Sequence, residues 1–113
     1  MAETFGISEA SPDGLAVLSV TGELDIATAP RLREQLESTI EAGSDPVIVD
    51  LLGVTFIDST ALGVLIGALK KCREADTELR LVVAEARVLK VFEITGLTSV
   101  FSVFPTVDAA TRG

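Results

Sequence analysis

The chain has 113 residues, a formal net charge of −8 and an apolar content of 48%. This length predicts one domain, covering residues 1–113, with enough material for a hydrophobic core. The negative charge argues against direct nucleic-acid binding, which draws most of its affinity from basic residues that neutralise phosphates. A single cysteine, Cys72, excludes an internal disulfide and fits a reducing cytoplasm.

The composition also removes most kinds of catalysis. The chain has no histidine, so a Ser-His-Asp relay cannot be assembled. One cysteine without histidine leaves no ligand set for zinc, and the acidic residues lack the spacing of a calcium loop. No phosphate-binding glycine motif is present. We therefore expect a protein that is not an enzyme and holds no metal or cofactor.

The apolar stretches are too short for a membrane span. The uncharged run over residues 59–69 falls far below the ~20 apolar residues that a spanning helix requires. Neither end of the sequence carries an apolar targeting segment. We expect a cytoplasmic protein with no membrane span.

The chain begins with a predicted hairpin. Residues 4–9 alternate weakly between apolar and polar and predict an edge strand, and residues 15–21 predict its partner. Between them, Ser11–Gly14 has proline and glycine at positions typical of a turn. The Gly-Glu-Leu-Asp sequence at residues 22–25 ends the second strand.

A helix is predicted next, beginning at Thr28-Ala29-Pro30, because proline is accommodated in a first helical turn. Apolar residues at helical spacing then give it one buried side: Leu32, Leu36 and Ile40. Gly43 suits a left-handed residue that ends the helix.

The central segment combines a strand with a second helix. The β-branched run Val47–Val49, bounded by Pro46 and Asp50, predicts a strand buried on both faces, and residues 51–57 are predicted to form a loop. Residues 58–60, Asp-Ser-Thr, are of the types that cap a helix by accepting its unpaired amides. They directly precede four apolar residues at helical spacing: Leu62, Leu65, Ile66 and Leu69.

The remaining chain predicts a strand over residues 79–83, a helix over residues 86–95 that stops at Gly96, a short strand at residues 103–104 and a short helix at residues 108–111. Alternating strands and helices are typical of an α/β layer fold. We expect a mixed β-sheet of about four to five strands with about four helices packed on it.

Two features of the central helix allow more than one interpretation. Ser59 fits a plain helix cap, but a phosphoryl group there would also face the free amides and positive dipole of the helix N-terminus. Gly63 and Gly67 each cost the helix about 1 kcal/mol relative to alanine. They fit either close packing on a neighbouring helix or a bare surface on which a partner protein docks. Cys72 fits a core position.

These segments together resemble the STAS domain family, and within it the bacterial anti-sigma factor antagonists, also called anti-anti-sigma factors. The resemblance is carried by residues 47–51 and 54–65, by the Gly-Glu-Leu-Asp sequence at 22–25, by Thr28-Ala-Pro, and by residues 94–97 with 100–101. The motifs occur in the family's order and spacing over nearly the whole chain. One departure is Ala61, where the family often has glycine, and we expect it to alter the contact surface slightly.

The resemblance implies a binding module controlled by phosphorylation, a partner-switching regulator of a sigma factor. In this family the unmodified antagonist binds an anti-sigma factor, itself a serine kinase that supplies the ATP site, and a serine phosphatase reverses the modification. Carried onto this chain, Ser59 is the phosphorylated residue and Thr60 a weaker acceptor. The partner-binding surface comprises Asp25, Thr28, Asp58, Ser59, Thr60, Ala61, Gly63 and Gly67.

Three alternatives remain. An acyl carrier protein is also small and acidic with Asp-Ser at a helix start, but carriers are all-helical and usually follow that serine with leucine. A STAS scaffold or transporter-regulatory module without a sigma-factor role would share the same motifs. A receiver-like domain with Asp50 as phosphoacceptor would need a magnesium-binding acidic cluster and a lysine that the sequence does not show.

Overall fold

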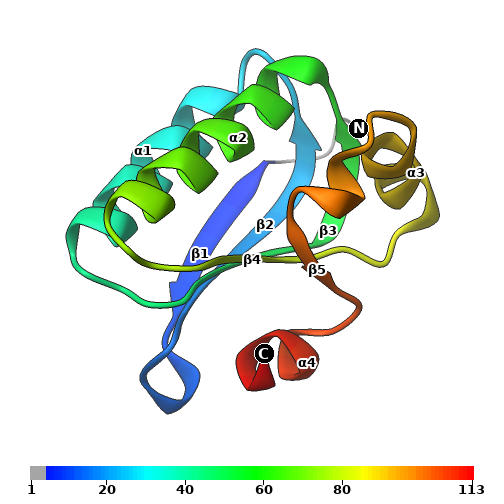
Figure 1. Cartoon of the computed structure of the whole chain (residues 1–113). Helices are drawn as coiled ribbons and strands as arrows, with labels where there is room; N and C mark the ends of the chain where they lie inside the picture. Colours follow the sequence, from blue (N-terminus) through cyan, green and yellow to red (C-terminus); the bar gives the residue numbers. More distant parts are fainter. Residues whose placement is uncertain (1–4) are drawn as a thin grey trace.

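The computed structural model describes residues 5–113, which form a five-stranded sheet in the order β1-β2-β3-β4-β5 (Figure 1). The strands are β1 (Gly6–Ala10), β2 (Ala16–Leu24), β3 (Val47–Ile57), β4 (Leu79–Val82) and β5 (Ser102–Phe104). β1 is antiparallel to β2, and the other neighbouring pairs are parallel. The predicted mixed sheet is confirmed.

Four α-helices lie within the described part of the chain: α1 (Ala29–Glu41), α2 (Ser59–Glu74), α3 (Ala86–Ile94) and α4 (Val107–Arg112). Short 3₁₀ turns occupy Pro12–Gly14 and Leu97–Ser99. The glycine stops are confirmed, because Gly43 and Gly96 have φ angles of 86° and 74°. Residue 4 of the predicted edge strand lies outside the described residues. No described helix has the length and apolar character needed to cross a membrane.

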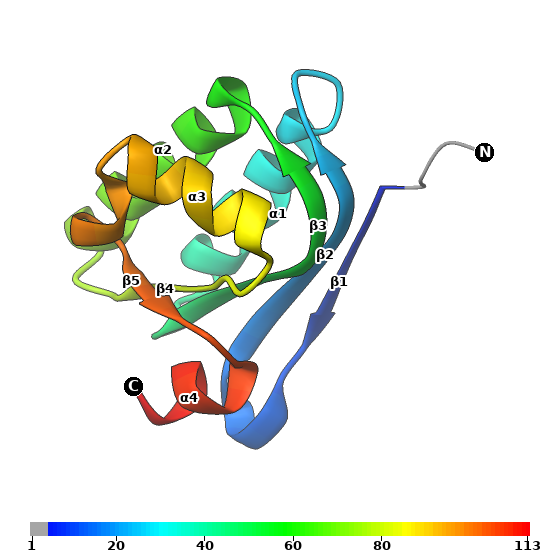
Figure 2. The same ribbon diagram turned by 90° about the vertical axis from the view of Figure 1, so that its right-hand side faces the viewer.

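The helices cover the sheet unequally (Figure 2). α1, α2 and α3 pack on one face, where their apolar sides and those of the strands form the main core. That core includes Cys72, as predicted, and burial raises the pKa of its thiol. On the opposite face, α4 brings Ala110 against a second, smaller cluster of Val17, Ile48 and Val82.

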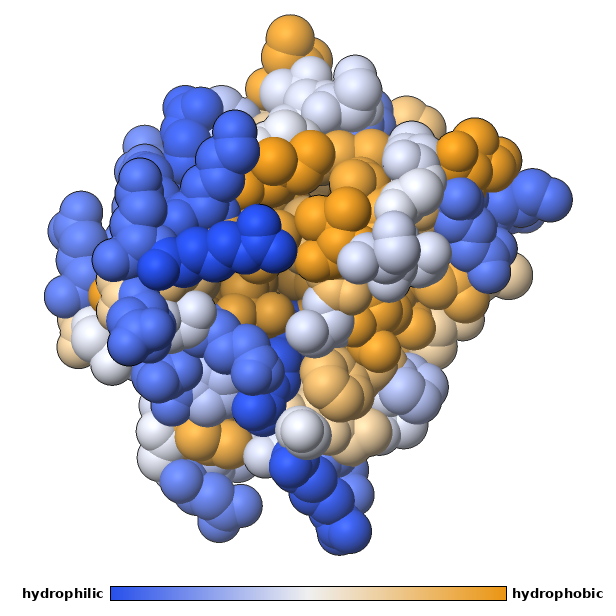
Figure 3. Space-filling view, in the orientation of Figure 1, coloured by the Kyte–Doolittle hydropathy of each residue, from blue (hydrophilic) through white to orange (hydrophobic). Residues whose placement is uncertain are grey.

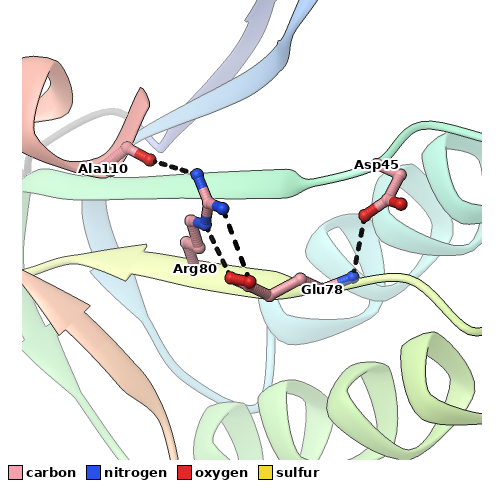
Figure 4. A network of polar contacts seen from close by, with 4 residues as sticks. All are labelled: Asp45, Glu78, Arg80 and Ala110. Atoms are coloured by element: carbon pink, nitrogen blue, oxygen red, sulfur yellow. Dashed lines mark hydrogen bonds and ion pairs between the residues drawn. The ribbon is translucent and has the colours of Figure 1, made fainter. Parts of the chain in front are cut away.

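α4 is joined to the sheet by a polar network around β4 (Figure 4). The Arg80 guanidinium donates to the carbonyl oxygen of Ala110 at 2.7 Å and to a carboxylate oxygen of Glu78 at 2.8 Å. It thereby holds the pKa of Glu78 below its ordinary value. The Glu78 amide donates to the Asp45 carboxylate at 3.1 Å, which links β4 to the loop before β3.

β3 is longer than the sequence indicates. It continues to Ile57, so the prediction of a loop at residues 51–57 was wrong. Its second half buries every third residue, Leu51, Val54 and Ile57, because register irregularities interrupt its pairing with β2. Gly53 is required there, since a Cβ would lie 2.7 Å from Cγ2 of Thr21 on β2. The extension carries the chain directly from β3 to Asp58 and α2.

Candidate functional site

The candidate site lies where the parallel strands β2 and β3 end together. Leu24 and Ile57 are register partners, and the Asp58 amide donates to the Leu24 carbonyl oxygen at 3.1 Å. Asp25 and Asp58 are the first residues after these two strands, so the chain brings them to the same edge of the sheet. The N-terminus of α2 begins at this edge, near the top of Figure 1.

Asp58, rather than Ser59, caps α2. An Asp58 carboxylate oxygen accepts a hydrogen bond from the Ala61 amide at 3.0 Å. Ser59 is the first helical residue and is exposed. The interpretation of Ser59 as a plain helix cap was therefore wrong, because the neighbouring aspartate supplies the capping bond.

The turn between β2 and α1 forms the second wall of the site. A carboxylate oxygen of Asp25 accepts from the amides of Ala27 and Thr28, at 2.9 and 3.1 Å. The Thr28 hydroxyl donates to the Glu23 carbonyl oxygen at 2.8 Å and accepts from the Asp25 amide at 2.9 Å. The two predicted site residues thus hold the turn in shape, and the turn presents Ile26 with 75% of its surface exposed.

The helix N-terminus gives the site a local positive potential within an acidic chain. The amides of Ser59 and Thr60 belong to the first turn, which has no intrahelical acceptors. Lys71 and Arg73 occupy the last turn of the same helix, where cations complement the dipole. An anion attached at Ser59 would meet these amides, while the Asp58 carboxylate would repel it.

A groove runs from this site between α1 and α2. It has a volume of about 280 Å³ and is lined by Arg33, Leu36, Glu37 and Ile40 of α1 and by Thr60, Gly63, Val64, Gly67, Ala68 and Lys71 of α2. A Cβ added at Gly63 or Gly67 would have no neighbouring atom within 4 Å. Of the two interpretations of these glycines, the one in which they allow close packing on a neighbouring helix was therefore wrong. They leave an open groove wall.

Ala61 does not reach the surface. Its side chain is fully buried in the main core, because it follows the cap on the inner side of α2. The expectation that its methyl group alters the contact surface was wrong. Asp25, Thr28 and Asp58 are half-buried at the site, and Ser59, Thr60 and Gly63 are exposed there.

The sequence did not indicate the α1 side of the groove. A usable signal is the helical spacing of Arg33, Leu36, Glu37 and Ile40, which puts them on one side of α1. That spacing alone does not show which α2 residues lie opposite. The two helices lie opposite each other because each connects two neighbouring parallel strands, and such connections are generally right-handed, which places both helices on the same face of the sheet.

The family model for the STAS domain matches residues 7–110. The chain belongs to the STAS domain family. Its relatives include the anti-sigma-B factor antagonist of Staphylococcus aureus strain NCTC 8325, 36% identical over 99 residues, which span 88% of this chain and 92% of that protein. The corresponding Listeria monocytogenes protein is 37% identical over 97 residues, which span 86% of this chain and 84% of that protein.

Two solved structures share the fold. An anti-sigma factor antagonist from Mycobacterium paratuberculosis superposes with a TM-score of 0.91 at 26% identity, covering 99% of this chain and 97% of that one. The Bacillus protein SpoIIAA in its phosphorylated form superposes with a TM-score of 0.70 at 21% identity, covering 96% and 98%. The second likeness shows the shared fold.

The fold also bears on two of the alternatives. An all-helical acyl carrier protein is excluded by the five-stranded sheet. The receiver-like interpretation gains no support from Asp50, whose two carboxylate oxygens each accept a hydrogen bond within the protein. One accepts from the Ser19 hydroxyl at 3.1 Å and the other from the Leu52 amide at 2.9 Å.

Proposed function

We propose that this STAS domain is an anti-sigma factor antagonist switched by phosphorylation of Ser59. In the proposal, the unphosphorylated form binds an anti-sigma factor that is a serine kinase, and this binding releases a sigma factor. Phosphorylation of Ser59 ends the binding. One observation carries the proposal: the Ser59 hydroxyl is exposed at the start of α2 while Asp58 supplies the cap.

This geometry suits a kinase substrate. The hydroxyl that attacks ATP must be accessible to the kinase. Its conversion to a phosphate ester must not remove a hydrogen bond that stabilises the helix. Ser59 meets both conditions, because the capping bond belongs to Asp58. The kinase would supply the ATP site, and a serine phosphatase would restore the hydroxyl. Thr60 is exposed one residue later and is the second, weaker candidate acceptor.

The size of the electrostatic effect is sufficient for a switch. A phosphate adds about −1.5 to −2 charges. One unit like-charge contact at ~4 Å costs about 4 kcal/mol at an effective dielectric near 20. Since each 1.4 kcal/mol or so changes affinity about tenfold, one badly placed phosphate abolishes a micromolar complex.

The proposed partner surface is the edge formed by the β2–α1 turn and the start of α2. It comprises Asp25, Thr28, Asp58, Ser59 and Thr60, with Gly63 and Gly67 continuing it along α2. Ile26 extends the same edge as an exposed apolar residue. An exposed apolar side chain beside polar groups is typical of a protein interface.

The proposal is tested by binding assays with the anti-sigma factor kinases encoded in the same genome. Wild-type protein and Ser59→Ala should bind one of them with similar affinity, and Ser59→Asp should bind at least tenfold more weakly. Ser38→Asp is the matched control, because it adds the same charge at an exposed serine of α1 away from the site. If Ser38→Asp weakened binding to the anti-sigma factor as much as Ser59→Asp does, a specific role for Ser59 would be refuted. Failure of the wild type to bind any candidate would favour a STAS scaffold without a sigma-factor role.

A further inference from the structure

The groove between α1 and α2 has a floor and a rim of different chemistry. Leu36 and Ile40 of α1 face Val64 and Ala68 of α2, so the floor is apolar. In Figure 3, which has the orientation of Figure 1, hydrophilic side chains cover the left-hand side, where α1 and the C-terminal half of α2 lie, and apolar side chains gather in the middle of the view. An apolar floor with a charged rim is the form of a site that receives an apolar side chain.

The volume of the groove indicates the kind of occupant. Binding sites for small molecules are usually clefts of roughly 300–1,000 Å³ that enclose most of the ligand. This groove, at about 280 Å³, lies at the lower edge of that range and is partly open to solvent. Its size suits one large apolar side chain of a protein, with Gly63 and Gly67 leaving the room that two side chains would otherwise fill.

The charges around the groove differ from those of the whole chain. Of its lining residues, Arg33 and Lys71 are cationic and Glu37 is anionic, whereas the chain carries a net charge of −8. Lys71 forms an ion pair with Glu37 across the two helices. After Lys71, Arg33 also acts on Glu37 and helps to lower its pKa. The three side chains together leave one positive charge, which favours an acidic residue next to the inserted side chain.

The groove is also continuous with the proposed phosphorylation site. Thr60 lines its upper end and directly follows Ser59. A protein large enough to cover Ser59 therefore also reaches the first turns of the groove.

We propose that the α1–α2 groove receives a single apolar side chain of the anti-sigma factor, with a neighbouring acidic residue that pairs with Arg33. This inference rests on the function proposed above and extends its interface from the α2 N-terminus to α1. The groove contributes to the affinity for the anti-sigma factor, and a phosphate on Ser59 prevents the complex from forming.

The test fills the groove without touching the phosphorylation site. Gly67→Leu places a side chain where a Cβ has open space and replaces a helical glycine, so the variant should fold and be at least as stable as the wild type. It should bind the anti-sigma factor at least tenfold more weakly than the wild type. Arg33→Glu should weaken binding severalfold. Ser38→Leu is the matched control, because it makes the same kind of change on α1 outside the groove, and it should bind like the wild type.

Phosphorylation kinetics provide a second readout. Gly67→Leu should raise the KM for phosphorylation of Ser59 by the anti-sigma factor while leaving kcat unchanged, since the groove contributes binding and no chemistry. If Gly67→Leu and Arg33→Glu bind as tightly as the wild type while Ser59→Asp does not bind, the groove is not part of the interface and the proposed function stands. If the wild type binds no anti-sigma factor, both proposals fall.

Discussion

The backbone amide of Asp58 donates to the carbonyl oxygen of Leu24 at 3.1 Å. This bond joins the end of β2 to the residue that caps α2, and it fixes the β2–α1 turn next to Ser59. The same Asp58 uses its carboxylate to accept from the Ala61 amide. One residue therefore connects the two strand ends to the helix that carries the proposed phosphorylation site.

Removing the cap should destabilise the start of α2. Asp58→Ala loses the bond to the Ala61 amide and should lower the free energy of unfolding by about 1 kcal/mol. Asp58→Asn keeps a capping oxygen and should stay close to the wild type. Urea unfolding followed by circular dichroism measures both. Equal destabilisation by asparagine would mean that the carboxylate charge, and not the capping bond, is what stabilises the helix.

Phosphorylation of Ser59 should leave the fold intact. The phosphate would lie at a helix N-terminus, whose free amides favour an anion, and the side chain it modifies is exposed. Thermal melting and amide NMR spectra of the phosphorylated protein check this expectation. Shifts should be confined to residues near the start of α2 and the β2–α1 turn. A cooperative loss of α2 would show that the modification acts by unfolding.

The order of elements and the place of Ser59 at the start of a helix could be predicted because strand runs, helix starts and glycine stops each leave a local signal. Gly43 and Gly96 ended helices as predicted. The second half of β3 could not be predicted, because its burial repeats every third residue and matches neither a strand nor a helix. That spacing arises from its irregular pairing with β2, which is a tertiary effect.

The surroundings of the two groove glycines could not be predicted from the sequence either. Gly63 and Gly67 fit close packing and an open surface equally well until the separation of α1 from α2 is known. Ala61 illustrates the same limit. It was predicted to be part of the contact surface, whereas the direction of α2 turns its methyl group into the core.

Two glycine substitutions should therefore have opposite effects on stability. Gly53→Ala places a Cβ 2.7 Å from Thr21 Cγ2 and 3.1 Å from the Val20 carbonyl oxygen, and should destabilise the protein by roughly 1–3 kcal/mol. Gly63→Ala meets open space within a helix and should stabilise it by up to about 1 kcal/mol. Urea unfolding of the two variants compares them directly. A loss of stability in Gly63→Ala would show that this helix position is not as open as described.

The Arg80 network should stabilise α4 mainly through its bond to Ala110. The Arg80 side chain is only 15% exposed, so Arg80→Ala should cost about 1.5–3 kcal/mol, the range for a hydrogen bond from a charged group. Glu78 is 48% exposed, and Glu78→Gln should cost less than about 1 kcal/mol. Unfolding experiments on both variants separate the contribution of the Arg80–Ala110 bond from that of the Arg80–Glu78 ion pair. A larger loss of unfolding free energy in Glu78→Gln than in Arg80→Ala would show that the ion pair matters more.

The Glu78 contribution should also depend on pH in a defined direction. Its pKa is lower in the folded protein because of Arg80, so the stabilisation is complete above the ordinary pKa of a glutamate. It should disappear as the pH falls through the lowered pKa. Comparing wild type with Glu78→Gln across this acidic range isolates the effect, and the difference in their free energies of unfolding should shrink at low pH.

The central claim is that one exposed hydroxyl at the start of α2 receives a phosphate from the anti-sigma factor. Incubation with candidate anti-sigma factor kinases and ATP, followed by intact-mass measurement, tests it most directly. The wild-type mass should rise by one phosphate and Ser59→Ala should gain none, with Thr60→Ala behaving like the wild type. Equal phosphorylation of the wild type and Ser59→Ala would contradict it.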